Sequence, residues 1–372
     1  MANSAPTKKD SPDEKAERIR DQVLALDVKR VADWIQALVR TLNWNSAFRD
    51  RPPRGDMNFR RKQDDREFLV RFPLGVKSGS FRVPRGLIQG QRLTQILRRE
   101  TIAVAGIDDF DRLPTRFRAI ATDLETGERK VLARGDLAEA LRASMSAPGV
   151  FAPVELDGRL LVDGGLVENL PVDIAKEMGV DVVIAVDVGF QPVGRRDLNS
   201  ALAVSNQMLT IMMQRETERQ RQLLAAGDLL VEPVLGSMLS MDFSAVDRTI
   251  EHGVTVTRAH GARLAALGVD DAVWQRYLAA RSHRQTTPST VQFVRTDPRS
   301  ERYRERIEAK LAPAVGKPLN PVAMERRVSM LYGDGNFESL DYKVVRDGEL
   351  SGIEVSARRK SWGPNFLRFG LE

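Results

Sequence analysis

The stretch LLVDGGLVENLPVDIAKEMGVDVVIAVDVG, residues 160–189, carries the signal for the fold. A short apolar run enters Asp163-Gly164-Gly165, where glycine supplies the backbone freedom of a tight turn. The next residues have helical spacing, and Gly179 is typical of a helix C-cap. The apolar run after Gly179 is typical of a strand covered on both faces. A helix that leads into such a strand predicts an α/β fold with a parallel sheet.

The composition narrows the classes of function. The 372 residues include 42% hydrophobic and 29% charged residues, as in an ordinary globular protein, and no window reaches the ~20 apolar residues of a spanning helix. There are no cysteines and three dispersed histidines, so we expect no metal site and no cofactor. The net charge of +6 is interspersed and lacks aromatic-interleaved basic motifs. No nucleic-acid partner is expected.

Periodicity and turn dipeptides predict the remaining elements of the first 280 residues. Alternating runs around Glu125-Thr126-Gly127 and around Asp157-Gly158 predict two hairpins. The charged, proline-containing residues 49–66 are expected to form a surface loop. Helices are expected at residues 23–42, at 86–101, before Pro148 and at 199–226, and a short strand at 228–235. In the helix at 199–226 the methionines are predicted to fill the core, namely Met208, Met212 and Met213.

The chemistry around Asp163 follows from a resemblance. The stretches ASMSAPGVFAPV and LLVDGGLVENLP, with TDLETG, GLIQGQ, FRRKQDDREFLV and LVRTLNWNSAF upstream, resemble the patatin-like phospholipases over roughly residues 35–280. The resemblance implies a partial three-layer α/β/α sheet and a Ser–Asp dyad that hydrolyses acyl-ester lipids through an acyl-enzyme. It carries over Asp163 as the dyad acid and Gly164 and Gly165 as its turn. Asn169 and Pro171 match flanking positions and are expected to be structural.

The chain departs from that family at the nucleophile. The family's serine lies in a G-x-S-x-G elbow, and this sequence contains no such stretch. Glycine pairs four apart, such as GVKSG at 75–79 and GLIQG at 86–90, have no serine in the middle. A glycine-rich oxyanion loop is also absent. Ser144 and Ser146 lie near Asp163 in sequence, but a helix that ends at Pro148 provides no elbow, so both are expected to be structural. No nucleophile is found.

The last eighty residues predict a separate α+β unit with the order β-α-α-β-β, and its two final strands turn at Asp347-Gly348. This unit looks like a POTRA domain. The order of patatin-like part and POTRA-like part is similar to bacterial type V-d secreted phospholipases, which implies an outer-membrane or secreted location in a Gram-negative bacterium. The final LRFGLE is expected to start a barrel strand that lacks partners. The first 21 residues contain no signal-peptide core.

These observations predict three parts and leave two functions open. The parts are a flexible leader at 1–30, a partial patatin-like domain at 31–285 and a POTRA-like domain at 286–372, with a polar seam at 281–290. One function is a lipid acyl hydrolase that is inactive because this chain lacks the nucleophile. In that case the encoding DNA is expected to continue past both ends. The other is a non-catalytic scaffold that binds lipid or a protein partner. The expected partners are phospholipid or another acyl-ester lipid and a membrane surface, and the oligomeric state stays open.

Overall fold

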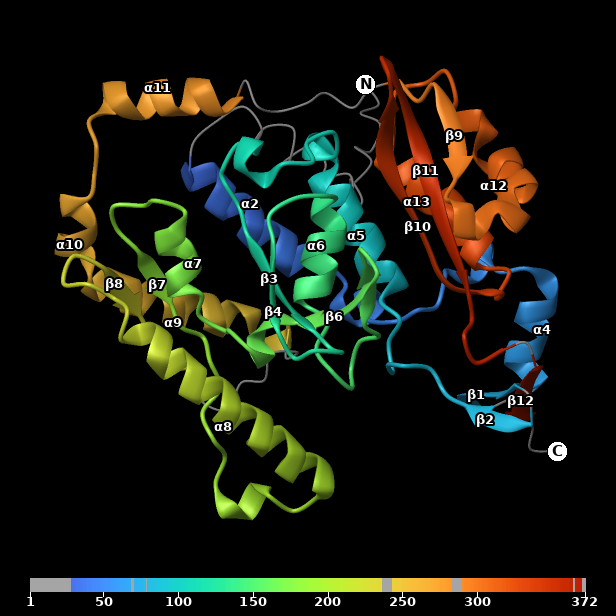
Figure 1. Cartoon of the computed structure of the whole chain (residues 1–372), viewed down its shortest axis with the longest axis horizontal. Coiled ribbons are helices and arrows are strands. Elements are labelled where there is room, and N and C mark those ends of the chain that lie inside the picture. Colours follow the sequence, from blue (N-terminus) through green and yellow to red (C-terminus); the bar gives the residue numbers. More distant parts are fainter. Residues whose placement is uncertain are drawn as a thin grey trace, which may run out of the picture. The chain divides into compact units, whose positions relative to one another are not determined.

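The computed structural model describes residues 28–67, 70–77, 79–235, 243–282, 290–363 and 365–369. The chain forms two compact units, and each is built from three separate segments. Unit 1 contains residues 1–44, 172–189 and 223–284, and unit 2 contains residues 45–171, 190–222 and 285–372. Figure 1 labels the elements of both units, which are described one at a time below. The predicted leader at 1–30 lies almost wholly outside the described residues.

Unit 1 is mainly helical around one pair of strands. Its elements are α2 (Val28–Thr41), α7 (Val172–Glu177), β7 (Ile184–Val186), β8 (Leu229–Val231), α9 (Val246–Ala259), α10 (Gly261–Ala266) and α11 (Asp271–Ser282). β7 and β8 pair in parallel, as predicted for a strand that follows a helix. The Asp228 carboxylate accepts hydrogen bonds from the backbone N–H groups of Val183 and Ala225, each at 2.8 Å. It thereby fixes the entry into both strands.

The prediction that β7 is covered on both faces is wrong. Ile184 and Val186 are 49% and 52% exposed, and only Ala185 between them is buried. The physical reason is the size of the sheet, because β8 is the one strand that pairs with β7 in the described part of the chain. A two-stranded sheet leaves the side chains on one of its faces exposed to solvent.

Unit 2 contains the sheet that carries the Asp163 turn. Its strand order is β4-β3-β6-β5, with all neighbours antiparallel, and the strands are β3 (Ala119–Asp123), β4 (Arg129–Leu132), β5 (Val154–Leu156) and β6 (Arg159–Asp163). Both predicted hairpins are confirmed. Gly127, Asp157 and Gly158 have positive φ, as the tight turns require. Helix α6 (Leu137–Ser144) packs against β3 and β6 and ends close to the predicted place.

The C-terminal part of unit 2 has the predicted order β-α-α-β-β. Its elements are β9 (Phe293–Thr296), α12 (Arg304–Leu311), α13 (Pro321–Tyr332), β10 (Phe337–Asp347) and β11 (Leu350–Arg359). The sheet order is β10-β11-β9, with β9 parallel to β11, and both helices pack on it (Figure 1). The likeness to POTRA domains stays a prediction. Residues 283–289 of the predicted seam lie outside the described residues.

Helix α5 (Gln91–Thr101) joins this core to the rest of unit 2. Ile102, directly after the helix, lies in the same buried cluster as Val328 and Leu340. The Gln91 side chain hydrogen-bonds both backbone groups of Leu340, at 2.6 and 2.8 Å. Arg98, almost fully buried, forms ion pairs with Asp136 and Asp341. α5 therefore packs through polar as well as apolar contacts.

Two further expectations for unit 2 are corrected. Residues 49–66 are not a plain loop, because they include most of α4 (Phe59–Glu67), whose start is capped by the Asn58 side chain accepting from the Arg61 N–H at 2.8 Å. The terminal strand β12 (Asn365–Phe369) does have a partner. It pairs antiparallel with β1 (Val70–Lys77), which also pairs with β2 (Ser80–Arg82). Sequence alternation shows a strand but not its neighbour.

Helix α8 (Ala201–Arg221) contradicts the prediction of core methionines at two of the three positions, whereas Met213 is half-buried beside Gly165. Met208 and Met212 are 61% and 59% exposed, although they have the spacing of a buried stripe. The reason is the direction in which the helix packs, which is described below.

The predicted α/β class is confirmed by the helices and the four sheets. The remaining α-helix of the described residues is α3 (Trp44–Ala47). Among the described residues, no helix is long and apolar enough to span a membrane.

Candidate active site

Asp163 lies at the C-terminal end of β6, where the strand turns into the short helix η4 (Gly164–Leu166). β6 pairs with β3, and Ala121 stands opposite Asp163. One carboxylate oxygen, Oδ1, accepts a hydrogen bond from the Gly165 N–H at 2.8 Å. The carboxylate thus caps η4, as aspartate does at many helix starts. This geometry fits both a turn residue and an acid held in a fixed position.

The two glycines of the turn are required for different reasons. A Cβ atom at Gly164 would lie 2.2 Å from the carbonyl oxygen of Ile120 on β3, so a side chain there would collide with backbone. A Cβ atom at Gly165 would lie 3.0 Å from the Asn169 Oδ1 and 3.1 Å from the Met213 Cε, both ends of flexible side chains. Gly164 sets the close approach of η4 to the sheet, whereas Gly165 leaves room beside the carboxylate.

Burial raises the pKa of the Asp163 carboxyl above its ordinary value, and the hydrogen bond from Gly165 opposes this rise. A carboxylate removed from water is a stronger base than one in solution. This change is in the direction that a proton-accepting dyad acid needs. It is also the direction that burial alone produces, so the pKa does not decide between catalysis and structure.

The backbone of Asp163 is held by its neighbours, and one of them is a candidate serine. Its N–H donates to the Ser146 carbonyl at 3.0 Å, and its carbonyl accepts from the Thr122 hydroxyl at 2.8 Å. The fully buried Ser146 hydroxyl donates to the Arg142 carbonyl at 2.7 Å and accepts from the Arg142 guanidinium. Within the described residues, no serine hydroxyl hydrogen-bonds the Asp163 carboxylate. Ser144 is the last residue of α6.

The Arg142 guanidinium, which hydrogen-bonds Ser146, lies in the electrostatic field of the half-buried Asp50 carboxylate, and the sequence did not reveal this arrangement. The Arg142 guanidinium also donates to the carbonyls of Gln89 and Ala152, at 3.0 and 3.3 Å. Burial lowers the pKa of Arg142 to about 10 and raises that of Asp50. The Asp50 carboxylate accepts from the backbone N–H groups of Gln89 and Gln91 at the start of α5.

Arg142 and Asp50 each join segments that are distant in sequence. Arg142 links the end of α6 to residues 89 and 152, and Asp50 links α5 to a segment forty residues earlier. The one sequence signal was Gly90, which has positive φ and whose Cβ would meet the Arg142 guanidinium at 2.3 Å. Arg142 and Asp50 together fix the loop that presents the Ser146 carbonyl to Asp163.

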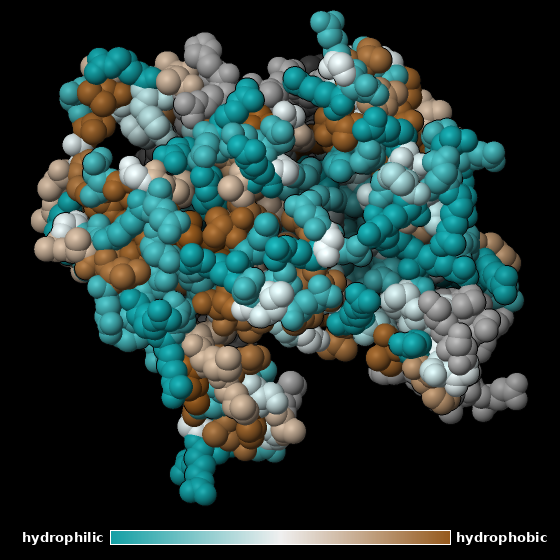
Figure 2. All heavy atoms as spheres, in the orientation of Figure 1, coloured by the Kyte–Doolittle hydropathy of each residue, from teal (hydrophilic) through white to brown (hydrophobic). Residues whose placement is uncertain are grey.

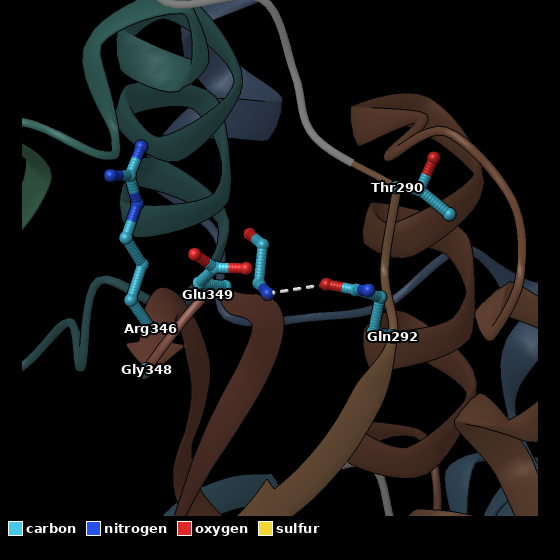
Figure 3. A pocket seen from close by; sticks show the side chains of 6 residues that line it. Thr290, Gln292, Arg346, Gly348 and Glu349 are labelled. Carbon is cyan, nitrogen blue, oxygen red and sulfur yellow. Dashed lines mark hydrogen bonds between the residues drawn. The ribbon is translucent and has the colours of Figure 1, made fainter.

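The described part of the chain contains no cluster of three His, Asp or Glu side chains that could hold a metal ion. An open hollow of about 530 Å³ lies away from Asp163, beside the tip of the β10–β11 hairpin (Figure 3). It is lined by Thr290, Gln292, Arg346, Gly348, Glu349 and Ser351. A hydrogen bond from the Ser351 N–H to the Gln292 side chain crosses it, and its charged residues are exposed. The one buried polar side chain of its lining is Ser351, and the charged residues are open to water, so the hollow does not have the enclosed, mostly apolar lining of a typical ligand site.

Comparison with known proteins bears on the Asp163 turn. Residues 14–176 match the family model described as patatin-like phospholipase, and this range ends just after the turn and its flanking residues. That part of the chain is similar to patatin-like phospholipases. The match contains Asp163, Gly164 and Gly165, as well as Asn169 and Pro171.

Similar curated proteins agree with the family match over shorter stretches. An uncharacterised NTE-family protein of Mycobacterium bovis is 36% identical over 109 residues, which are 29% of this chain and 29% of that protein. Patatin-like phospholipase domain-containing protein 7 of mouse is 48% identical over 73 residues, 19% of this chain and 5% of its own length. Human patatin-like phospholipase domain-containing protein 6 is 45% identical over 74 residues, which are 19% of this chain and 5% of that protein's length. The matches therefore span a small part of each relative.

Proposed function

We propose that the patatin-like part of this chain supplies the acid half of a Ser–Asp site for acyl-ester lipids, and that Asp163 is the acid. The observation that carries the proposal is the turn itself. A partly buried carboxylate with a raised pKa is held by the Gly165 N–H at the end of a strand, inside the stretch that matches patatin-like phospholipases. In such a dyad the aspartate accepts the serine proton while the serine attacks the ester carbonyl.

We further propose that the 372 residues do not hydrolyse esters by themselves. The sequence has no G-x-S-x-G elbow, and the Ser146 hydroxyl is engaged by Arg142. In the described part of the chain no serine hydroxyl meets the Asp163 carboxylate, and the sequence lacks the family's glycine-rich oxyanion loop. The site would then lack the donor contribution that alone lowers such barriers by roughly 3–4 kcal/mol.

The test compares the chain with Asp163→Asn, a substitution of nearly equal volume. We expect both to hydrolyse short p-nitrophenyl esters at the same rate, and a fluorophosphonate probe for activated serines to label neither. The Ser146→Ala variant serves as a second control. If the chain shows turnover or labelling that Asp163→Asn abolishes, a nucleophile exists and the proposal that the chain is inactive is wrong.

The second candidate is a non-catalytic scaffold, favoured by the complete use of the Ser146 hydroxyl within the protein. In that case Asp163 acts only as the cap of η4. The two candidates differ when a G-x-S-x-G segment of a patatin-like protein is added as a separate polypeptide. The acid-half proposal expects ester hydrolysis that Asp163→Asn removes, and the scaffold expects none.

A further inference from the structure

Helix α8 packs inward with a face of mixed polarity. Met213, Thr217 and Gln220 are spaced four and three residues apart, so they share one face. Thr217 and Gln220 are buried, and Met213 lies against the Gly165 turn in η4. Through Met213 this face packs against η4 of unit 2.

The opposite side of α8 is apolar and exposed. Val204, Met208, Ile211 and Met212 follow at steps of four, three and one, which forms a second stripe, and all four are exposed. We call these four residues the outer stripe. In Figure 2, tan and brown atoms gather over this part of the helix, at the lower end of the view. An apolar stripe turned to water on an ordered helix indicates a surface that is covered by something else.

A strap of residues 190–193 lies beside the helix and is fixed to it. The Gln207 side chain hydrogen-bonds both backbone groups of Val193, at 3.0 and 3.1 Å. The Gln214 side chain donates to the Phe190 carbonyl at 3.2 Å. Phe190 and Val193 are themselves exposed, so the strap extends the apolar surface. The surface is therefore built from two elements joined by hydrogen bonds.

The distribution of charge indicates what binds to this apolar surface. Residues 198–214 contain no charged side chain, and arginines flank them on both sides, at 195 and 196 and again at 215, 219 and 221. Phe190 to Gln222 contains five arginines and three acidic residues. An apolar segment flanked by arginines matches a lipid–water interface, where aliphatic side chains enter the acyl region and arginines reach the headgroups. A second copy of the chain is a poorer match, because the outer stripe with Phe190 and Val193 offers less than the ~800 Å² per partner of a standard interface.

We infer that the outer stripe and the strap dock this protein on a phospholipid surface with some anionic lipid. The inference rests on the proposed function for its choice of lipid, and it adds where the lipid surface is met. Because Met213, one residue after the stripe, contacts the Gly165 turn, the docked helix would connect the lipid surface with Asp163. The binding itself requires no ester hydrolysis.

The experiment measures binding of the full chain to vesicles by co-sedimentation, with phosphatidylcholine alone or mixed with phosphatidylglycerol. We expect the double variant Met208→Gln/Met212→Gln to lower the partition coefficient about tenfold on both vesicle types, because two apolar side chains no longer enter the interface. Met208→Leu/Met212→Leu should keep binding. The matched control Val315→Gln/Val322→Gln changes two exposed apolar residues elsewhere in unit 2 and should stay within about twofold of the wild type.

Two further measurements decide between explanations. Arg195→Gln/Arg196→Gln should weaken binding to the anionic vesicles alone, about fivefold for each arginine at low salt. Asp163→Asn should bind as the wild type does, so this inference and the catalytic proposal fail separately. Unchanged binding by the methionine double variant overturns the inference. It is also overturned if light scattering shows a dimer that this variant dissociates while vesicle binding persists.

Discussion

Helices α13 and α8 both carry methionine at helical spacing, and they use it in opposite ways. Met324 of α13 is 1% exposed and lies in the cluster with Val328 and Leu340. Met212 of α8 is largely exposed, while Thr217 and Gln220 on the same helix are buried. Periodicity therefore shows that a helix has an apolar stripe. It does not show which way that stripe faces, because the direction depends on partners far away in sequence.

The largest expected effect tests this comparison directly. Met324→Ala should lower the free energy of unfolding by about 2–5 kcal/mol, because it leaves a cavity in a packed core. Met212→Ala should change it by less than about 0.5 kcal/mol, because the side chain is already in water. Urea denaturation followed by circular dichroism measures both. Equal losses for the two variants would show that the outer stripe is packed after all.

Two adjacent glycines of the Asp163 turn also differ in their surroundings, because backbone lies against one and flexible side chains lie against the other. Gly164→Ala should destabilise the protein by about 1–3 kcal/mol, because the new methyl group meets the Ile120 carbonyl. Gly165→Ala should cost less than about 1 kcal/mol, since the Met213 and Asn169 side chains can move. Thermal denaturation of the two variants gives the order. The reverse order would mean that the turn is built differently.

The smallest expected effect is on the pH dependence of stability. It compares a glutamate in the interior near α5 with a glutamate on the surface of α8. Burial, with Asp136 and Asp341 nearby, raises the pKa of Glu139 to about 7, against the opposing influence of Arg98 and Lys343. The folded protein then binds the Glu139 proton more tightly than the unfolded chain does. This contribution to stability is present below about pH 4.5 and is lost as the pH rises to about 7.

Glu139→Gln should therefore remove about 1–2 kcal/mol of the decline in stability between pH 4.5 and 7.5. The buried Asp341, whose pKa burial also raises, keeps part of the decline in the variant. Glu218→Gln, exposed on α8, is the control and should leave the pH profile unchanged. Urea titrations at several pH values give the profiles. Parallel profiles for wild type and Glu139→Gln would contradict the raised pKa.

The features that the sequence did predict are those encoded by neighbouring residues. Asp157-Gly158 adopts the positive φ angles of a two-residue turn, so its hairpin could be read from two letters. The Asp163 turn was found because its residues are adjacent, and the resemblance gave it a chemical meaning. The β-α-α-β-β order likewise follows from local periodicity.

The features that were missed depend on contacts between distant residues. Arg98 meets Asp136 and Asp341, which lie 38 and 243 residues away, and no local pattern announces such a pair. The antiparallel partner of β12 is β1, at the other end of unit 2 in sequence. Asp50 and Arg142 were overlooked for the same reason, since each looks like an ordinary surface charge.

The contact between Gln91 and Leu340 has a consequence for synthesis of the protein. The two residues are 249 positions apart, so at about 5–20 residues per second the ribosome completes α5 about 10–50 s before the strand that covers it. During that time the inner side of the helix faces water. Gln91, Gln95 and Arg98 on that side are well hydrated there, which lowers the risk of aggregation that a wholly apolar helix would carry. The buried polar groups of α5 thus suit a helix that must wait for its partner.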